Sequence, residues 1–204
     1  MENPPQDGWI LLYAFIEKAL EMENSDKFLL LKSKILFKKN SINESAKILD
    51  LIKYDEEDAD YLNFAGLVKQ YDYSLNEALN YFKQALKIAP NNHEYCYNLA
   101  STYFKKGEVS SSKKYYNLAI SLAPENPNYH FALANLYYAE KQYKRAFEEL
   151  KYDFYESNLL KAIILYDTGY LALARKILSK LENERPEDTI LLDYKKRIEN
   201  DLKI

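Results

Sequence analysis

The sequence predicts an all-α protein built from repeated pairs of helices, and three observations support this fold class. The chain of 204 residues has only 4 Gly and 6 Pro, too few for the many tight turns of a β-sandwich or β-barrel. Two segments repeat at a fixed spacing, and candidate helix caps fall between them. Because 48 % of the residues are hydrophobic, the chain can bury a continuous core, and we expect one domain over residues 1–204.

The repeat is clearest where ALNYFKQALKIAP (78–90) aligns with SKKYYNLAISLAP (112–124), an offset of 34 residues. Small and large residues alternate in the same way in both copies: Ala78, Phe82, Ala85 and Pro90 in the first, and Ser112, Tyr116, Ala119 and Pro124 in the second. Small residues let two helices approach closely, while the aromatic residue fills the space beside them. Proline cannot continue a helix, so it ends each pair.

The segment before each of these copies has a second pattern. It contains Leu62, Ala65 and Gly66 in one copy, and Cys96, Leu99, Ala100 and Tyr103 in the next. The two patterns together resemble the tetratricopeptide repeat, whose helices carry W-x₂-L-G-x₂-Y and A-x₃-F…P. The resemblance implies a right-handed α-α superhelix of about five helix pairs plus terminal capping helices.

The remaining elements follow from this register. We expect an N-terminal half-repeat helix at 6–24, then repeats at 27–58, 59–92, 93–126, 127–154 and 155–187. The repeat at 27–58 matches the pattern only weakly, through Leu30, Phe37 and Ala46. The fourth contains His130, Leu133, Ala134 and Tyr137 but lacks the closing Ala and Pro, and the fifth follows early, since Ala146 and Ala174 are 28 residues apart.

The last segment, 188–204, is predicted to be a capping helix. Its apolar stripe of Ile190, Leu191, Tyr194 and Ile198 would seal the end of the stack against water. Local capping signals agree with the repeat. Ser41-x-x-Glu44, Ser74-x-x-Glu77 and Asn91-x-x-Glu94 are predicted capping boxes, and Asn126-Pro127 is a predicted N-cap followed by a first-turn proline.

Charge and cysteine content exclude several classes of partner and site. The net charge is −3 with both signs interspersed, so no basic surface is available for nucleic acid. Cys96 is the only cysteine; we expect it to pack as a small apolar residue in a reducing compartment. No signal peptide is predicted, and Glu17, Lys18 and Glu21 interrupt the best candidate for a membrane helix. We therefore expect a cytoplasmic protein without membrane insertion.

No catalytic, metal or cofactor site is predicted, so the expectation is that the protein is not an enzyme. His93 and His130 have no second Cys or His nearby in sequence, and His130 is expected to pack. Motifs such as G-x-S-x-G, a Gly-rich phosphate loop and H-E-x-x-H do not occur. The acidic run DEEDAD (55–60) lacks the glycine of a calcium loop, and we interpret it as a solvated helix start that favours negative charge.

The resemblance also implies a concave groove lined by the first helix of each pair. The predicted groove residues are Asn63, Leu67, Tyr97, Asn98, Ser101, Lys105, Phe131, Asn135 and Tyr138. Asparagine can donate to and accept from a peptide main chain, and aromatics add apolar contact area. The predicted function is a scaffold or adaptor that binds a protein or peptide in this groove.

Two alternatives remain open at this point. In the first, the groove residues bind no partner and are ordinary solvated or half-buried helix faces. In the second, the partner is another copy of this chain, held by the apolar N-terminal helix around Trp9, Leu12, Tyr13 and Phe15. One specialised groove of the family clamps a C-terminal carboxylate, and this sequence departs from it. Asn98 matches one asparagine of that clamp, but Asn63, Leu67, Asn128 and Ala132 replace its Lys, Asn, Lys and Arg, which disfavours a co-chaperone.

Overall fold

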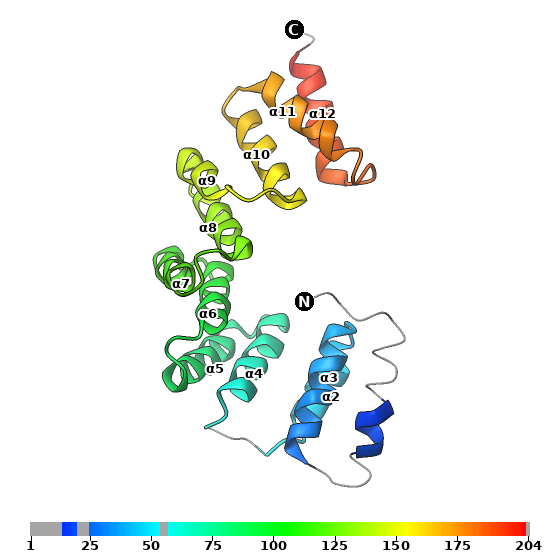
Figure 1. Cartoon of the computed structure of the whole chain (residues 1–204), viewed down its shortest axis with the longest axis vertical. Helices are drawn as coiled ribbons and strands as arrows, with labels where there is room; N and C mark the ends of the chain where they lie inside the picture. Colours follow the sequence, from blue (N-terminus) through cyan, green and yellow to red (C-terminus); the bar gives the residue numbers. More distant parts are fainter. Residues whose placement is uncertain (1–13, 20–24, 54–56, 203–204) are drawn as a thin grey trace. The chain divides into compact units, whose positions relative to one another are not determined.

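The computed structural model describes residues 14–19, 25–53 and 57–202, and every regular element within them is a helix. Residues 14–19 are helical, and eleven helices follow in sequential antiparallel pairs (Figure 1). They are α2 (Asp26–Lys38), α3 (Ile42–Leu49), α4 (Ala59–Tyr71), α5 (Leu75–Ile88), α6 (His93–Lys105), α7 (Val109–Leu122), α8 (Pro127–Ala139), α9 (Tyr143–Glu149), α10 (Tyr155–Asp167), α11 (Leu171–Leu181) and α12 (Thr189–Asp201). The predicted all-α fold class is confirmed.

The chain divides into two compact units, residues 1–108 and 109–204, and each has its own set of helix contacts. In the first unit α2 packs on α3, α4 on α5, and α5 also on α6. In the second unit α7 packs on α8, α8 on α9, and α10 on α11, while α12 packs on both α10 and α11. Helices thus contact mainly their neighbours along the chain, as expected for a repeat protein.

Close approach of paired helices depends on small residues, as the repeat pattern predicts. A Cβ added at Gly66 in α4 would lie 2.7 Å from the ring of Phe82 in α5, which is fully buried. Between α2 and α3 the small pair is Ser33 and Ser45, both fully buried. The Ser33 Oγ donates to the Ser45 carbonyl (2.6 Å), and the Ser45 Oγ donates to the Ser33 carbonyl (2.7 Å). Ala46 was predicted as the small residue of the second helix in this repeat, and this prediction is wrong by one residue because Ser45 occupies the position.

The same backbone turn joins the two helices of each pair in the described chain. One residue in each turn has a positive φ: Asn40 (64°), Tyr73 (58°), Gly107 (80°), Lys141 (58°) and Gly169 (85°). The next N–H then bonds a carbonyl five residues back, as in Ser41 N to Leu36 O (2.9 Å). This is the Schellman arrangement, which satisfies carbonyls at the end of the first helix.

These turns explain why two of the predicted capping boxes do not form. Ser41 and Ser74 are N-cap residues, but neither side chain caps its helix, because ψ is 62° and 59° instead of extended. The predicted box at Asn91 is also displaced, since Asn92 is the N-cap and accepts from Glu94 N and Tyr95 N. The prediction at Asn126 is confirmed, because its side chain accepts from Asn128 N and Pro127 follows.

The last helix covers the apolar surface of α10 and α11, as predicted for a cap, and three of the four predicted stripe residues take part. Leu191 and Ile198 are fully buried, and Tyr194 is half-buried. Ile190 is 52 % exposed, so its place in the predicted stripe is wrong. Asp188 is the N-cap of α12, and its side chain accepts from Ile190 N and Leu191 N.

Candidate functional site

Predicted groove residues of the first unit form a chain of hydrogen bonds between α4 and α6. Asn98 Nδ2 donates to Asn63 Oδ1 (2.9 Å), and Thr102 Oγ1 donates to the Asn98 carbonyl (2.8 Å). Gln70 Nε2 donates to Thr102 Oγ1 (2.6 Å), and Lys105 Nζ donates to Gln70 Oε1 (3.1 Å). We call these five residues the α4–α6 polar ladder. It fixes the rotamers of side chains on two consecutive first helices.

The ladder differs in accessibility along its length. Asn63 is only 8 % exposed and Thr102 is fully buried, whereas Asn98 is half-buried and Lys105 is exposed. Protein atoms near the Lys105 ammonium displace water from it, which lowers the pKa of Lys105. Asn98 therefore lies where the ladder passes from the core to the surface.

The other predicted residues of this unit flank the ladder. Tyr97 and Ser101 are half-buried on α6, and burial raises the pKa of the Tyr97 hydroxyl. Leu67 is also half-buried but packs against the core cluster of α4, so it contributes to stability as well as to the surface. The structure thus brings Asn63, Asn98 and Lys105 into one hydrogen-bonded chain, with Tyr97 and Ser101 on the same helix.

The predicted residues of the second unit all lie half-buried on α8 and are engaged with neighbouring groups. The Phe131 ring packs edge-on against Phe154, with centroids 5.5 Å apart. Asn135 Nδ2 donates to the Phe131 carbonyl (2.9 Å), and the Tyr138 hydroxyl donates to Asp167 Oδ2 (2.8 Å). Burial, followed by the bond to Asp167, raises the pKa of Tyr138, which keeps its hydroxyl a donor.

Gln70 and Thr102 are ladder members that sequence reasoning missed. A signal for Thr102 was present, because Asn98, Thr102 and Lys105 are spaced i, i+4 and i+7 and lie on one helix stripe. Gln70 follows Asn63 by two helical turns. Polar residues at these spacings on consecutive first helices would have predicted the ladder.

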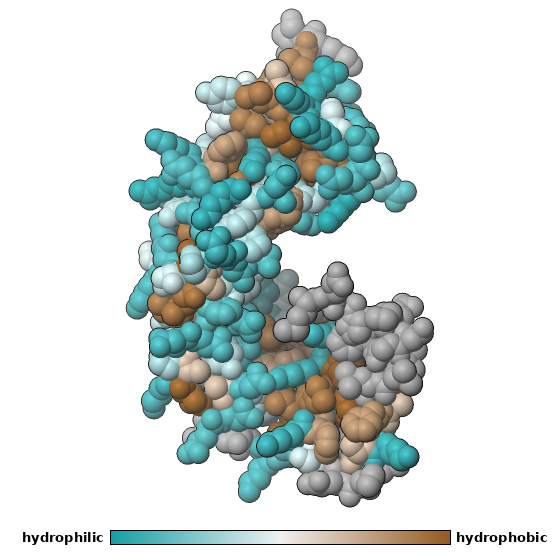
Figure 2. All heavy atoms as spheres, in the orientation of Figure 1, coloured by the Kyte–Doolittle hydropathy of each residue, from teal (hydrophilic) through white to brown (hydrophobic). Residues whose placement is uncertain are grey.

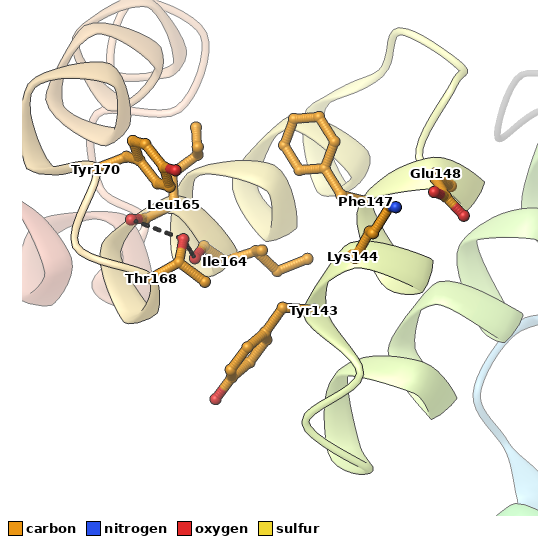
Figure 3. A pocket seen from close by; sticks show the side chains of 8 residues that line it. All are labelled: Tyr143, Lys144, Phe147, Glu148, Ile164, Leu165, Thr168 and Tyr170. Atoms are coloured by element: carbon orange, nitrogen blue, oxygen red, sulfur yellow. Dashed lines mark hydrogen bonds between the residues drawn. The ribbon is translucent and has the colours of Figure 1, made fainter.

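A pocket of about 480 Å³ lies between α9 and the end of α10, and the sequence did not predict it. Figure 3 shows side chains of α9 on one side and those of α10 and the following turn on the other. The lining residues are Tyr143, Lys144, Phe147, Glu148, Ile164, Leu165, Thr168 and Tyr170. The walls are mainly apolar, and the pocket lies within the second unit.

The histidine, cysteine and acidic residues that could take part in catalysis or metal binding are packed or cap helices in the structure. His130 is 6 % exposed, with Nδ1 2.7 Å from Glu149 Oε2 and Nε2 2.9 Å from the Pro124 carbonyl, so it packs as predicted. Cys96 is fully buried. Asp58, from the acidic run, is the N-cap of α4 and accepts from Asp60 N and Tyr61 N, which fits its interpretation as a helix start. Within the described ranges, three or more His, Cys, Asp or Glu side chains nowhere gather as metal ligands.

The N-terminal segment is only partly described. Phe15, in the helical residues 14–19, is 66 % exposed, whereas Trp9, Leu12 and Tyr13 lie outside the described residues. Contact with a second copy through this segment stays an alternative prediction. No helix among the described residues has the length and apolar composition needed to cross a membrane.

Comparison with known proteins supports the repeat assignment. Residues 72–136 match a family model described as tetratricopeptide repeat. A solved structure of PilF from Pseudomonas aeruginosa is 16 % identical, with a TM-score of 0.73 over 94 % of this chain and 96 % of that one. PilW, a type IV pilus biogenesis factor, is 19 % identical, with a TM-score of 0.79 over 91 % and 90 %. A comparison with curated protein sequences found no significant match.

A third structure, YrrB, is described as a TPR protein with an unusual peptide-binding site; it is 18 % identical, with a TM-score of 0.64 over 89 % of this chain and 97 % of that one. At these identities the structures show the shared fold alone. The family match identifies tetratricopeptide repeats over residues 72–136, and the helix pairs show the fold of such repeats across the described chain. This fold is generally a protein-interaction module and is typically not catalytic.

Proposed function

We propose that this protein is a scaffold or adaptor that binds a peptide or protein segment on the first helices of its repeats. The observation that carries the proposal is the α4–α6 polar ladder, and within it the half-buried Asn98. A ligand side chain or main chain that meets Asn98 finds an amide already held in one orientation, so less conformational entropy is lost on binding.

The hydrogen-bonding capacity of Asn98 suits a peptide main chain. One of the two N–H groups of its side-chain amide is engaged with Asn63, and the side-chain oxygen Oδ1 accepts no hydrogen bond from the described residues. A peptide unit offers both an N–H and a carbonyl, so it can satisfy the remaining groups without requiring a particular side chain. Tyr97, the adjacent residue on α6, would add apolar contact area.

The second unit supports the proposal by itself. Phe131 and Tyr138 present half-buried aromatic surface on α8, held by Phe154 and Asp167. Asn135 is engaged with its own helix backbone, so we expect it to contribute less than Asn98. The Lys and Arg of the carboxylate clamp are absent at Asn63, Asn128 and Ala132, which favours an internal segment of the partner over a free C-terminus.

A selection from displayed random peptides tests the proposal. We expect peptides selected on the natural protein to bind at least about tenfold more weakly when Asn98→Ala is combined with Tyr97→Ala, which corresponds to a loss of about 1.4 kcal/mol. The loss follows from removing both the amide and the aromatic contact. Binding is measured by titration of labelled peptides.

Two matched controls separate contact with the peptide from loss of internal structure. Asn63→Ala breaks the same Asn63–Asn98 bond, but Asn63 is 8 % exposed and offers little surface, so we expect a smaller effect. Asn80→Ala changes an exposed asparagine on the second helix α5 and should leave binding unchanged. Selected peptides that bind the Asn98→Ala, Tyr97→Ala protein as tightly as the natural one would contradict the proposal.

A further inference from the structure

We propose that the pocket between α9 and α10 is a second docking site, and that it takes an amphipathic helix of a partner protein. The inference rests on the proposed protein-binding function but uses a different surface. The occupant is a helix with apolar anchors on one face, and with a carboxylate and a cation placed one helical turn apart beside them. The α9 helix, the pocket walls and the charges at the rim each support this assignment.

Helix α9 lacks the packing that other second helices of the chain have. It has seven residues, and only Ala146 is buried within it. Helix α5 buries four residues and α11 buries three. Helix α10 packs on α9, but α9 and α11 do not pack directly on each other, as is also the case for the second helices α3 and α5. One side of α9 therefore faces a groove with no helix from the second unit in it, and a partner helix can fill that place.

The walls of the groove expose large apolar side chains. Phe147 on α9 is 42 % exposed, and Tyr170 in the turn after α10 is 60 % exposed. Between them lie Ile164 and Leu165 of α10 (Figure 3). Hydrophobic residues are also exposed over α10 to α12 in Figure 2, bordered by hydrophilic ones. Apolar anchors of a partner would gain contact mainly with Phe147 and Tyr170, since Leu165 is half-buried and Ile164 is only 3 % exposed.

The groove is preformed by contacts around Tyr138. Its ring packs against Tyr143 of α9, with centroids 5.9 Å apart, and its hydroxyl donates to Asp167 at the end of α10. Thr168 Oγ1 donates to the Ile164 carbonyl (2.6 Å), so this polar atom of the lining is already satisfied. An apolar ligand can enter without leaving this hydroxyl unpaired.

The rim carries two opposite charges without partners in the described part of the chain. Lys144 and Glu148 are exposed, and no ion pair or hydrogen bond of either side chain is present among the described residues. With Phe147 they occupy positions i, i+3 and i+4 of one helical stripe. A partner helix along this stripe would place a carboxylate against Lys144 and a cation against Glu148, which defines its charge pattern.

Three helical peptides of about 18 residues test this pattern, a length at which an alanine-based helix is stable enough to measure. Each carries the same stripe of Leu and Phe anchors. Two flanking positions one turn apart hold Glu and Lys in the first peptide, two Glu in the second and two Lys in the third. The comparisons of the two-Glu and two-Lys peptides with the charge-changed variants do not depend on the direction in which the helix binds, whereas the mixed peptide matches both charges in one direction only. Binding is measured by fluorescence anisotropy at low salt with the full-length protein.

We expect the natural protein to prefer the mixed peptide by about threefold, because exposed ion pairs contribute modestly. Glu148→Lys should shift the preference to the two-Glu peptide, and Lys144→Glu should shift it to the two-Lys peptide. Phe147→Asp should abolish binding of all three. Leu192→Asp is the matched control, since Leu192 on α12 is equally exposed at 42 % and should leave binding unchanged.

A second measurement locates the peptide. The methyl resonances of Ile164 and Leu165 should shift on binding of the mixed peptide. The inference is overturned if no peptide binds, if charge changes do not alter the preference, or if these methyl signals stay in place. The inference is also overturned if the protein self-associates and Phe147→Asp abolishes the self-association, because the pocket between α9 and α10 is then occupied by a second copy of this chain. Asn98→Ala with Tyr97→Ala should not affect these peptides, so failure here and failure of the proposed function are distinguishable.

Discussion

At the residue scale, complementary sizes hold the two helices of a pair together. In α4 and α5 the smallest residue, Gly66, faces the ring of Phe82. In the second unit Ala134 and Leu150 belong to one core cluster, and Ala162 and Leu178 to another. The offset between the two members is the same 16 residues in all three pairs. A larger residue on the second helix thus accompanies a smaller one on the first, because the total volume is limited.

This complementarity predicts the effect of Gly66→Ala. Its added Cβ would lie less than 3 Å from the Phe82 ring, so we expect the free energy of unfolding to fall by about 1–3 kcal/mol from overpacking. Phe82→Leu alone should also destabilise, by leaving a cavity. The double variant re-creates the Ala–Leu combination of α10 and α11 and should be more stable than the sum of the two losses predicts.

Urea denaturation of the two single variants and the double variant checks this coupling. The control is Asn80→Ala, an exposed change on the same helix α5 as Phe82. Losses that simply add in the double variant would mean that Gly66 and Phe82 do not act through their contact.

At the element scale, turns and caps set where each helix begins and ends. Five turns in the described chain share a residue with positive φ, yet two of these residues are Tyr73 and Lys141. Glycine at positions 107 and 169 indicates such a turn from composition alone, whereas tyrosine and lysine do not. At Tyr73 and Lys141 the packing of the two helices imposes a backbone conformation that the local residue does not prefer.

Helix α12 depends on its cap at Asp188, which gives a prediction in two parts. Asp188 Oδ1 accepts from Ile190 N (2.9 Å) and Leu191 N (3.0 Å). Asp188→Ala should lower the free energy of unfolding by about 1 kcal/mol, whereas Asp188→Asn keeps an acceptor and should lose less. Urea denaturation at neutral pH measures both.

The second part concerns acid. The backbone hydrogen bond from Leu191 is the main cause of the lowered pKa of Asp188, whose ordinary value is 3.8. Since the folded pKa lies below the unfolded one, the carboxylate stabilises the fold fully above the unfolded value, and this stabilisation is lost as pH falls through the folded value. Asp188→Asn should show a smaller loss of stability over that range, and an identical pH profile would contradict the assignment.

At the scale of the whole molecule, stability is expected to be local because helices contact mainly their sequence neighbours. Leu191→Ala removes a fully buried side chain from the α10–α12 core and should cost about 2–4 kcal/mol. Ile190→Ala, one residue away and 52 % exposed, is the matched control and should change stability by less than about 0.5 kcal/mol.

Hydrogen exchange shows where the Leu191→Ala protein opens. We expect faster exchange in α10, α11 and α12, while amides of α4 and α5 keep their protection. Uniformly faster exchange along the chain would instead mean that all helices unfold as one cooperative unit.

The amino-acid sequence alone was enough to predict the all-α class, the repeat and the small residues at close helix contacts. These features recur at a fixed spacing, and each depends on residues close together in the chain, as in Ala78 and Phe82. The candidate site was predicted less completely. Asn63, Asn98 and Lys105 were predicted as groove residues because the resemblance points to first helices, but Gln70 and Thr102, which link them by hydrogen bonds, were not predicted.

The tertiary structure decided the features that depend on the rotation of one helix against another. The rotation of α12 excludes Ile190 from the core while its neighbour Leu191 is buried, and the rotation of α3 places Ser45, not Ala46, at the α2–α3 contact. Helix rotation also determines which polar groups meet in the α4–α6 polar ladder, and it leaves the pocket beside Phe147. A periodic pattern gives the face of a helix only to within about one residue, or 100° of rotation, whereas packing and hydrogen bonding require the orientation of each side chain.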